Sequence, residues 1–254
     1  MEEKGMEEKK EKQNREHKRG EKMTEAIAKF SQDAFARKDT SNKFDENGNP
    51  LLYCGNTIVS FLNQPGEEMF EAAKSIQEAM KPCSFASCLA FLPPSSFHMT
   101  VLTLCREIDR STPVWPTGIS RTASMNEIDL ELKKRIEPIA FPRDIMMAFE
   151  VCELNRLVVK PADAESQKKI WNYRDTVADV TGIRHSWHDT FRFHISLNYC
   201  FRPLSPAQEA ESKAFCEHMT ALWKAKLHPF LVPKAEFVIF NNMLAYDTDL
   251  CKRI

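Results

Sequence analysis

Hydrophobic and polar residues alternate with a period of two in two short segments, FHMTVLTL at 97–104 and FRFHISLNY at 191–199. Because successive side chains of a strand point to opposite faces, each segment is predicted to be a strand with one polar and one apolar face. His98 and Thr100 would share the polar face of the first strand, about 6–7 Å apart. His194 and Ser196 would share that of the second. The apolar faces would carry Phe97, Met99 and Val101 in one strand, and Phe193, Ile195 and Leu197 in the other.

The hydrophobic periodicity of the rest of the chain predicts alternating strands and helices. Further strands are expected at 51–62, 85–92, 144–154, 155–161 and 235–243, and helices at 24–38, 66–80, 125–137, 164–182 and after the capping box at 205–208. The helix at 164–182 has its apolar stripe at Ile170, Tyr173, Val177 and Val180, and Gly182 as its stop.

Two connections are informative. Pro93 and Pro94 leave only a tight link between the strand at 85–92 and the first motif strand, which favours antiparallel pairing of the two. Residues 106–124, which contain Pro113, Trp115 and Gly118, are expected to form a long irregular loop that could cover a site.

A strand, a helix and a motif strand occur once in each half of the chain. We therefore expect an α+β fold of two pseudo-symmetric lobes, each an antiparallel sheet flanked by helices, on either side of a central cleft. Lobe one would span about 40–125 and lobe two about 126–254, within a single domain at 24–254. Residues 1–23 interleave acidic and basic side chains, which is typical of a disordered tail or a frayed helix.

Composition limits the partners and the cellular location that we expect for the protein. A net charge of −1 over 254 residues gives no overall positive field for long duplex nucleic acid. No apolar run approaches a membrane span, and eight cysteines without a CxxC pair indicate reduced thiols. We expect a monomeric cytoplasmic protein without a membrane partner; the composition allows a nuclear location as well.

The bare pattern of a histidine two residues before a hydroxyl is not selective. It also occurs at His188 and Thr190, in a polar segment, and at His218 and Thr220, in the helix predicted after residue 205. Residues two apart on a helix point in different directions, so the pair at His218 is discounted. Only the pairs at His98 and His194 lie in strand-like runs.

Two such motifs on strands of an α+β chain resemble the two-histidine (2H) phosphoesterase superfamily, which includes RNA 2′,3′-cyclic phosphodiesterases, 2′-5′ RNA ligase-like proteins and the U6 RNA-trimming enzyme. The FHMTV and FRFHISLNY contexts, with the entry strand KFDENGNPLLYCGNTIVSFL, look most like a poorly characterised branch of it. The resemblance implies that His98 and His194 are the catalytic pair, and that Thr100 and Ser196 contact phosphate. It further implies a phosphoric diester hydrolase that needs no metal or other cofactor.

The chemistry agrees with that implication. Hydrolysis of a phosphodiester requires one group to accept a proton and another to donate one, and an imidazole can do either near neutral pH. Hydroxyls can donate to the nonbridging oxygens. Arg192 shares the predicted face of His194 and could add a charge-assisted bond to phosphate, or it could be a solvated residue at the strand end.

Two further groups of residues have other interpretations. His185, His188 and His194 invite a zinc site, but no His-Glu-x-x-His helix accompanies them. Trp115 and Trp187 could stack a base or simply pack on the rim. The expected substrate is a 2′,3′-cyclic phosphate, a short 2′-5′ or 3′-5′ linked nucleotide, or an RNA end. The alternative is a catalytically silent module that binds a nucleotide or RNA end.

Overall fold

The structure is a computed structural model and describes residues 42–254. The tail predicted at 1–23 and the helix predicted at 24–38 lie outside these residues. The described chain divides into a large unit, residues 42–184 and 193–254, and a short segment, residues 185–192, which belongs to a second unit.

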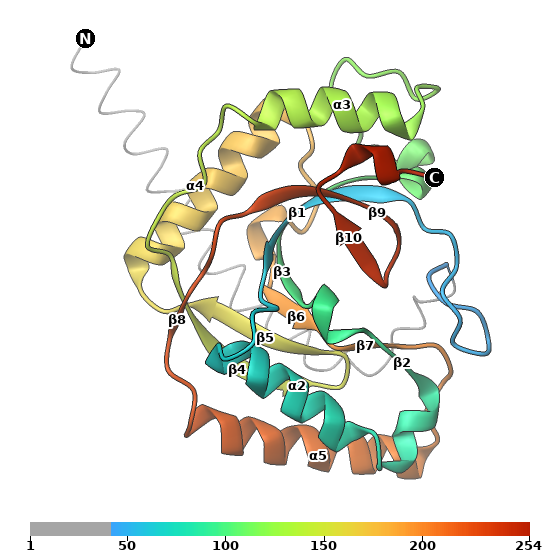
Figure 1. The fold of residues 1–254 in the computed structure, drawn as a ribbon, viewed down its shortest axis with the longest axis vertical. Helices are drawn as coiled ribbons and strands as arrows, with labels where there is room; N and C mark the ends of the chain where they lie inside the picture. The colour runs from blue at the N-terminus through green and yellow to red at the C-terminus, as the bar shows by residue number, and fades with distance from the viewer. Residues whose placement is uncertain (1–41) are drawn as a thin grey trace. The chain divides into compact units, whose positions relative to one another are not determined.

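An eight-stranded antiparallel sheet forms the centre of the large unit and curls into a half-barrel (Figure 1). Its strand order is β10-β9-β1-β3-β6-β5-β4-β8. The strands are β1 (Gly55–Phe61), β3 (His98–Arg106), β4 (Met146–Glu153), β5 (Arg156–Pro161), β6 (His194–Ser196), β8 (Phe230–Leu231), β9 (Glu236–Asn242) and β10 (Ala245–Asp247). A second sheet pairs β2 (Leu89–Phe91) with β7 (Asn198–Cys200).

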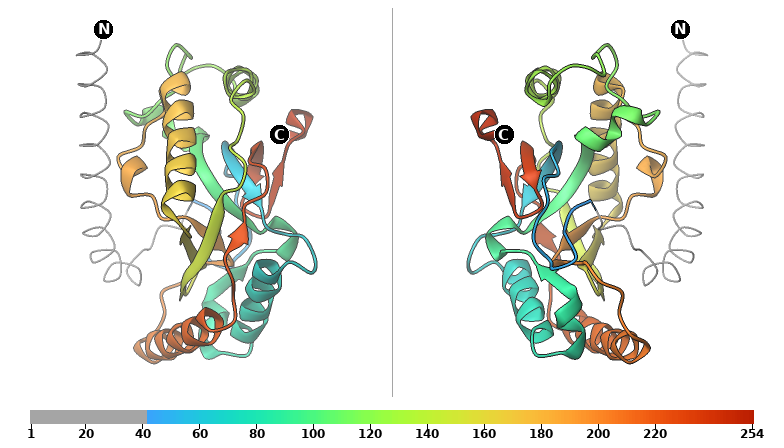
Figure 2. Two further views of the ribbon diagram at one scale, coloured as in Figure 1. Left: turned by 90° about the vertical axis from the view of Figure 1, so that its left-hand side faces the viewer. Right: turned by 90° about the vertical axis from the view of Figure 1, so that its right-hand side faces the viewer.

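Four α-helices accompany these sheets in the described part of the chain: α2 (Glu68–Met80), α3 (Met125–Ile136), α4 (Ala164–Thr181) and α5 (Pro206–Lys224). Figures 1 and 2 show α3 and α4 toward one end of the large unit and α2 and α5 toward the other. Capping boxes at Ser124 and Ser205 start α3 and α5, and Gly182, with φ of 75°, ends α4. Across residues 42–254, none of the helices has both the length and the apolar character needed to span a membrane.

Helix α4 packs against the apolar face of the two motif strands. The ring of Trp171 lies 5.9 Å from that of Phe193, and the guanidinium of Arg174 donates a hydrogen bond to the carbonyl oxygen of Val101. The predicted stripe of α4 is correct except at Val180, which is exposed. The buried stripe is centred on Arg174 and Val177, so Val180 falls at its edge.

The predicted antiparallel pairing of residues 85–92 with the first motif strand is wrong. Residues Ser84–Cys88 form a 3₁₀ helix, β2 pairs with β7, and β3 pairs with β1 and β6. The predicted strand at 191–199 also divides into two at Leu197. The amide of Leu197 donates to the carbonyl oxygen of Asn155, so β6 joins the large sheet while β7 joins the small one.

The two-lobed pseudo-symmetry is not confirmed. Strands from both halves of the chain lie in one continuous sheet, where β3 of the first half is hydrogen-bonded directly to β6 of the second. The mixed α+β class is confirmed, and so is the antiparallel arrangement of the strands within the sheets.

Candidate active site

The two motifs lie on adjacent antiparallel strands, with Met99 of β3 opposite Ile195 of β6. This register places His98 opposite Ser196 and Thr100 opposite His194. Directly opposed residues share a face of the sheet, with Cβ atoms about 5 Å apart. The two histidines therefore occupy one diagonal of a square of four residues, and the two hydroxyl side chains occupy the other.

The opposite face of these strands is apolar, as the alternation predicts. The side chains of Phe97, Met99, Val101, Phe193 and Ile195 are all buried. This packing fixes the direction of the four polar side chains, since a strand that buries Met99 and Ile195 on one side must present their neighbours on the other.

His98 is enclosed, with only 6% of its surface exposed. Its Nδ1 lies 2.7 Å from the carbonyl oxygen of Ser96. Because a carbonyl oxygen only accepts hydrogen bonds, Nδ1 carries a proton, and Nε2 of the neutral ring carries the lone pair. Burial lowers the pKa of His98 to about 4, although the hydrogen bond to Ser96 acts to raise it. His98 is therefore neutral at pH 7.

Two aromatic rings enclose His98. The ring of Phe61, opposite His98 on β1, lies 6.5 Å away, and that of Tyr246 lies only 4.2 Å away. Tyr246 belongs to β10, three places from β3 in the sheet, and reaches His98 because the sheet curls. Burial raises the pKa of Tyr246 well above its ordinary value, so its hydroxyl stays protonated. Tyr246 is absent from the sequence prediction, which ends its last strand at residue 243.

His194 and Ser196 are half-buried on β6, on either side of the fully buried Ile195. On the far side of β6, the strand β5 places Val158 opposite His194 and Arg156 opposite Ser196. Arg156 therefore shares the face of the four motif residues. The sequence analysis missed it, because nothing local indicates that β5 pairs with β6.

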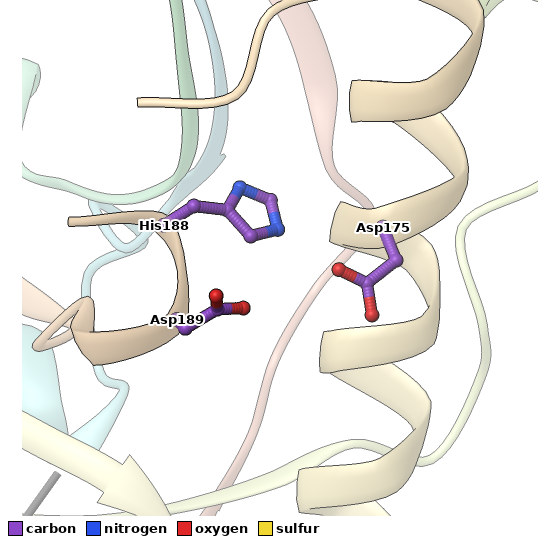
Figure 3. A group of neighbouring side chains, drawn as sticks. All are labelled: Asp175, His188 and Asp189. Carbon is purple, nitrogen blue, oxygen red and sulfur yellow. The ribbon is translucent and has the colours of Figure 1, made fainter. Parts of the chain in front are cut away.

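Arg192, the predicted phosphate ligand, precedes β6 and lies in the segment 185–192, so strand alternation does not set its direction. Within that segment the rings of His185 and Trp187 stack 4.4 Å apart. His188 and Asp189 are successive residues of the 3₁₀ helix His188–Thr190 (Figure 3).

Figure 3 also draws Asp175, a residue of α4 in the large unit. Its carboxylate accepts hydrogen bonds from both terminal nitrogens of Arg184, each at 3.1 Å. These bonds tie the chain that leaves the end of α4 back to the helix.

The loop at 106–124 is bound to α3 and the end of α4: the amide of Thr117 donates to the carbonyl oxygen of Thr181, and Arg135 donates to that of Thr117. It starts where β3 ends, about 25 Å along the strand from His98. Trp115 packs within the loop, where its indole nitrogen donates to the carbonyl oxygen of Ile119. The guanidinium groups of Arg110 and Arg121 lie 5.6 and 5.2 Å from its ring. The expectation that this loop covers the site is wrong.

A cavity of about 240 Å³ lies elsewhere in the large unit, with Lys133, Glu137, Tyr173, Glu236 and Thr248 in its wall. None of the motif residues lines it. Burial raises the pKa of Tyr173 to about 12, so its hydroxyl stays protonated at neutral pH.

Paired histidines and hydroxyls on adjacent strands of a curled antiparallel sheet are the arrangement expected of a two-histidine phosphoesterase. Residues 43–158 match the family model 2H-phosphodiest, described as a domain of unknown function (DUF1868). This match places residues 43–158 in the 2H phosphoesterase superfamily. The matched region contains the first motif, at His98 and Thr100; the second motif lies beyond it.

The fold is similar to that of a solved structure. The conserved protein of unknown function ATU0111 from Agrobacterium tumefaciens is 27% identical, with a TM-score of 0.75, over 80% of this chain and 88% of that one. TT0787 of Thermus thermophilus is 18% identical, with a TM-score of 0.35, over 72% of this chain and 86% of that one. No curated protein matches the sequence.

Proposed function

We propose that this protein is a metal-independent phosphodiesterase that hydrolyses a 2′,3′-cyclic phosphate, a short 2′-5′ or 3′-5′ linked nucleotide, or an RNA end. The observation that carries the proposal is the diagonal arrangement of His98 and His194 across β3 and β6. Diagonal neighbours of an antiparallel pair are about 7–8 Å apart, which leaves room for a phosphate between the two rings. Thr100 and Ser196 then flank the same phosphate from the other diagonal.

In this proposal the surroundings of the two rings set their roles. His98 is neutral, with its lone pair on Nε2, and accepts the proton of the attacking oxygen. His194, which is less enclosed, is the acid that protonates the leaving oxygen on the other side of phosphorus. Thr100 and Ser196 donate hydrogen bonds to the nonbridging oxygens, where charge accumulates in the transition state.

The overall charge favours a small or terminal substrate. Binding along a long nucleic acid requires many cationic contacts to phosphate, and a net charge of −1 offers little general attraction for it. A cyclic phosphate or a single terminal linkage needs only the local groups of the site.

The test is hydrolysis by the purified full-length protein in the presence of a chelator. The substrate panel contains 2′,3′-cyclic nucleotides, ADP-ribose cyclic phosphate and 2′-5′ oligoadenylate, and products are identified by mass spectrometry. We expect turnover of at least one member at a rate that EDTA does not change. Loss of the rate with EDTA and its recovery with added zinc or manganese would contradict metal independence.

Variants of the two histidines connect turnover to the site. His98→Ala and His194→Ala are each expected to lower turnover by about 10²–10⁴-fold, and the double variant by little more, because the pair acts as a unit. The matched control is His218→Ala, which removes an exposed histidine of the same His-x-Thr pattern from α5. Binding of a panel member without turnover by any form of the protein would instead identify a binding module.

A further inference from the structure

The short strand β10 brings one aromatic side chain to His98. β10 lies at the edge of the large sheet and pairs with β9 (Figure 1). Because successive side chains of a strand alternate between its faces, Tyr246 points to the side opposite to Ala245 and Asp247. The ring of Tyr246 lies 4.2 Å from that of His98, which leaves no room for water between the two rings. Tyr246 is only half-buried, whereas His98 is enclosed.

A second ring supports Tyr246. The ring of Phe240, on β9, lies 5.5 Å from that of Tyr246. Gly55 is opposite Phe240 on β1, and a Cβ at Gly55 would be only 2.5 Å from Cζ of Phe240. The absence of a side chain at Gly55 thus allows the ring of Phe240 to lie where it does. The contacts form a continuous series from β1 through Phe240 and Tyr246 to His98.

The contact between Tyr246 and His98 is one of ring against ring. The hydrogen bond of the Tyr246 hydroxyl is made to Sδ of Met243, at 3.8 Å, and a thioether is a weak acceptor. The hydroxyl is therefore not what holds the imidazole. A phenylalanine at this position could make the same contact with His98.

Few charges act on His98 from the elements around it. Strand β1, which presents the ring of Phe61, and the turn at 94–96 contain no titratable residue. The titratable groups of the other two neighbours are His194 on β6 and Asp247 on β10, and the carboxylate of Asp247 is engaged in a surface ion pair. Exclusion of water is therefore the main influence on the protonation of His98, and the ring of Tyr246 contributes to that exclusion.

We propose that Tyr246 is a positioning residue of the paired-histidine site, whose ring closes His98 off from water and so keeps that imidazole neutral and able to accept a proton. This inference rests on the proposed function, in which His98 is the base, and it extends the site to β10. It implies a base that still works in acidic solution, where an exposed histidine would already be protonated.

The experiment follows the protonation of His98 directly, in the full-length protein with ¹³C-labelled histidine. NMR titrations compare the wild type with Tyr246→Ala, Tyr246→Leu and Tyr246→Phe, and the His98 signal is identified by its absence from His98→Gln. The control is Tyr199→Ala, which removes a ring that lies 5.3 Å from Phe44 and whose hydroxyl also contacts Met243, at 3.4 Å. Hydrolysis of the best member of the substrate panel is measured over the same pH range, and thermal unfolding shows whether each variant is folded there.

We expect Tyr246→Ala to raise the pKa of His98 from about 4 to about 5.5–6.5, because water then reaches the imidazole. The acid limb of kcat/KM should move with it, so that kcat/KM falls about 4–30-fold at pH 5 but stays within about threefold of the wild type at pH 8. Tyr246→Leu should give an intermediate pKa. Tyr246→Phe and Tyr199→Ala should leave both the pKa and the acid limb unchanged.

A His98 that titrates near pH 4 in folded Tyr246→Ala, as in the wild type, would overturn the inference. An equal rise of the pKa in Tyr199→Ala would overturn it as well, since the loss of a ring without contact to His98 would then suffice. If Tyr246→Ala does not stay folded in acid, Tyr246→Leu decides in its place. The titration needs no substrate, so a wild type that hydrolyses no member of the panel contradicts the proposed function alone, while the pKa values still decide whether Tyr246 shields His98.

Discussion

His98 and His194 have different surroundings although their motifs match. His98 is covered by Tyr246 and Phe61, and its Nδ1 is engaged by a backbone carbonyl. His194 is half-buried on a strand of three residues. A pair that transfers protons in two directions benefits from this asymmetry, because burial disfavours the charged form of His98. The environment, and not the sequence motif, therefore distinguishes the proposed base from the proposed acid.

A substrate with a good leaving group separates the two roles. Nitrophenolate departs without a proton, so an acid is dispensable for bis(4-nitrophenyl) phosphate while a base remains necessary. We expect His194→Ala to lose less than about 10-fold on this ester but about 10²–10⁴-fold on the nucleotide substrate. His98→Ala should lose the larger factor on both. The reverse pattern, measured by single-substrate kinetics, would exchange the assigned roles.

Acid stability reports the burial of His98 without any substrate. The pKa of His98 is lowered to about 4 by burial, whereas an unfolded histidine titrates near 6.5. Between these values the unfolded chain binds more protons, so the free energy of unfolding falls as the pH falls. Replacing His98 with glutamine removes this term. From pH 7 to pH 5, the wild type should lose about 2 kcal/mol more than His98→Gln in urea denaturation.

The control for that experiment is His218→Gln, on the exposed surface of α5. It should follow the wild-type dependence on pH. Parallel curves for the wild type and His98→Gln would show that His98 is not held neutral by the fold.

At the scale of elements, the sequence predicted the features that depend on residues close together in the chain. The alternation around His98 and His194, the capping box at Ser205 and the stop at Gly182 each depend on a few neighbouring residues, and each is confirmed. Pairing between distant strands is not encoded locally. The neighbours of β2 and the break at Leu197 depend on hydrogen bonds from residues far along the chain, so the sequence could not supply them.

Gln77 of α2 shows how one side chain fixes that break. It is buried, and its amide donates to the carbonyl oxygens of Leu92 and Leu197, both at 2.8 Å. Leu197 follows Ser196 directly, so Gln77 holds the end of the second motif. Gln77→Met keeps the volume but removes both donors, and should lower the free energy of unfolding by about 1–3 kcal/mol.

Chemical denaturation measures this change, with Gln64→Met as the control because Gln64 is exposed. Hydrolysis should also fall in Gln77→Met under conditions where the variant is fully folded, since the position of Ser196 depends on the bond. Unchanged stability and unchanged turnover would show that the carbonyl groups find other donors.

At the scale of the molecule, the site is assembled from distant parts of the sequence. Its histidines are 96 positions apart, its cover at Tyr246 is close to the C-terminal end, and the curl of one sheet brings all three together. The prediction of two facing lobes put the two motifs on opposite sides of a cleft, but the structure places them side by side on neighbouring strands. Sheet closure depends on twist and packing summed over eight strands, which no single motif reveals.

Arg253, near the C-terminal end, stabilises the curled sheet. Its side chain is 2% exposed and pairs with the fully buried Asp129 of α3 at 2.7 Å. It also donates to the carbonyl oxygens of Phe240 on β9 and Gly55 on β1, at 2.7 and 2.9 Å. One guanidinium thereby joins α3 to β9 and β1, and β9 is the neighbour of β10, the strand that carries Tyr246.

Arg253→Ala should therefore lower the free energy of unfolding by about 3–5 kcal/mol, because it leaves the Asp129 carboxylate buried without its cation. The matched control is Lys252→Ala, since the neighbouring Lys252 pairs with Asp247 at the surface and such pairs contribute about 0–1 kcal/mol. Urea denaturation compares the two variants, and Arg253→Ala combined with Asp129→Leu, which replaces both charges, should recover part of the loss. Equal stabilities of the two single variants would show that the fold closes without this buried pair.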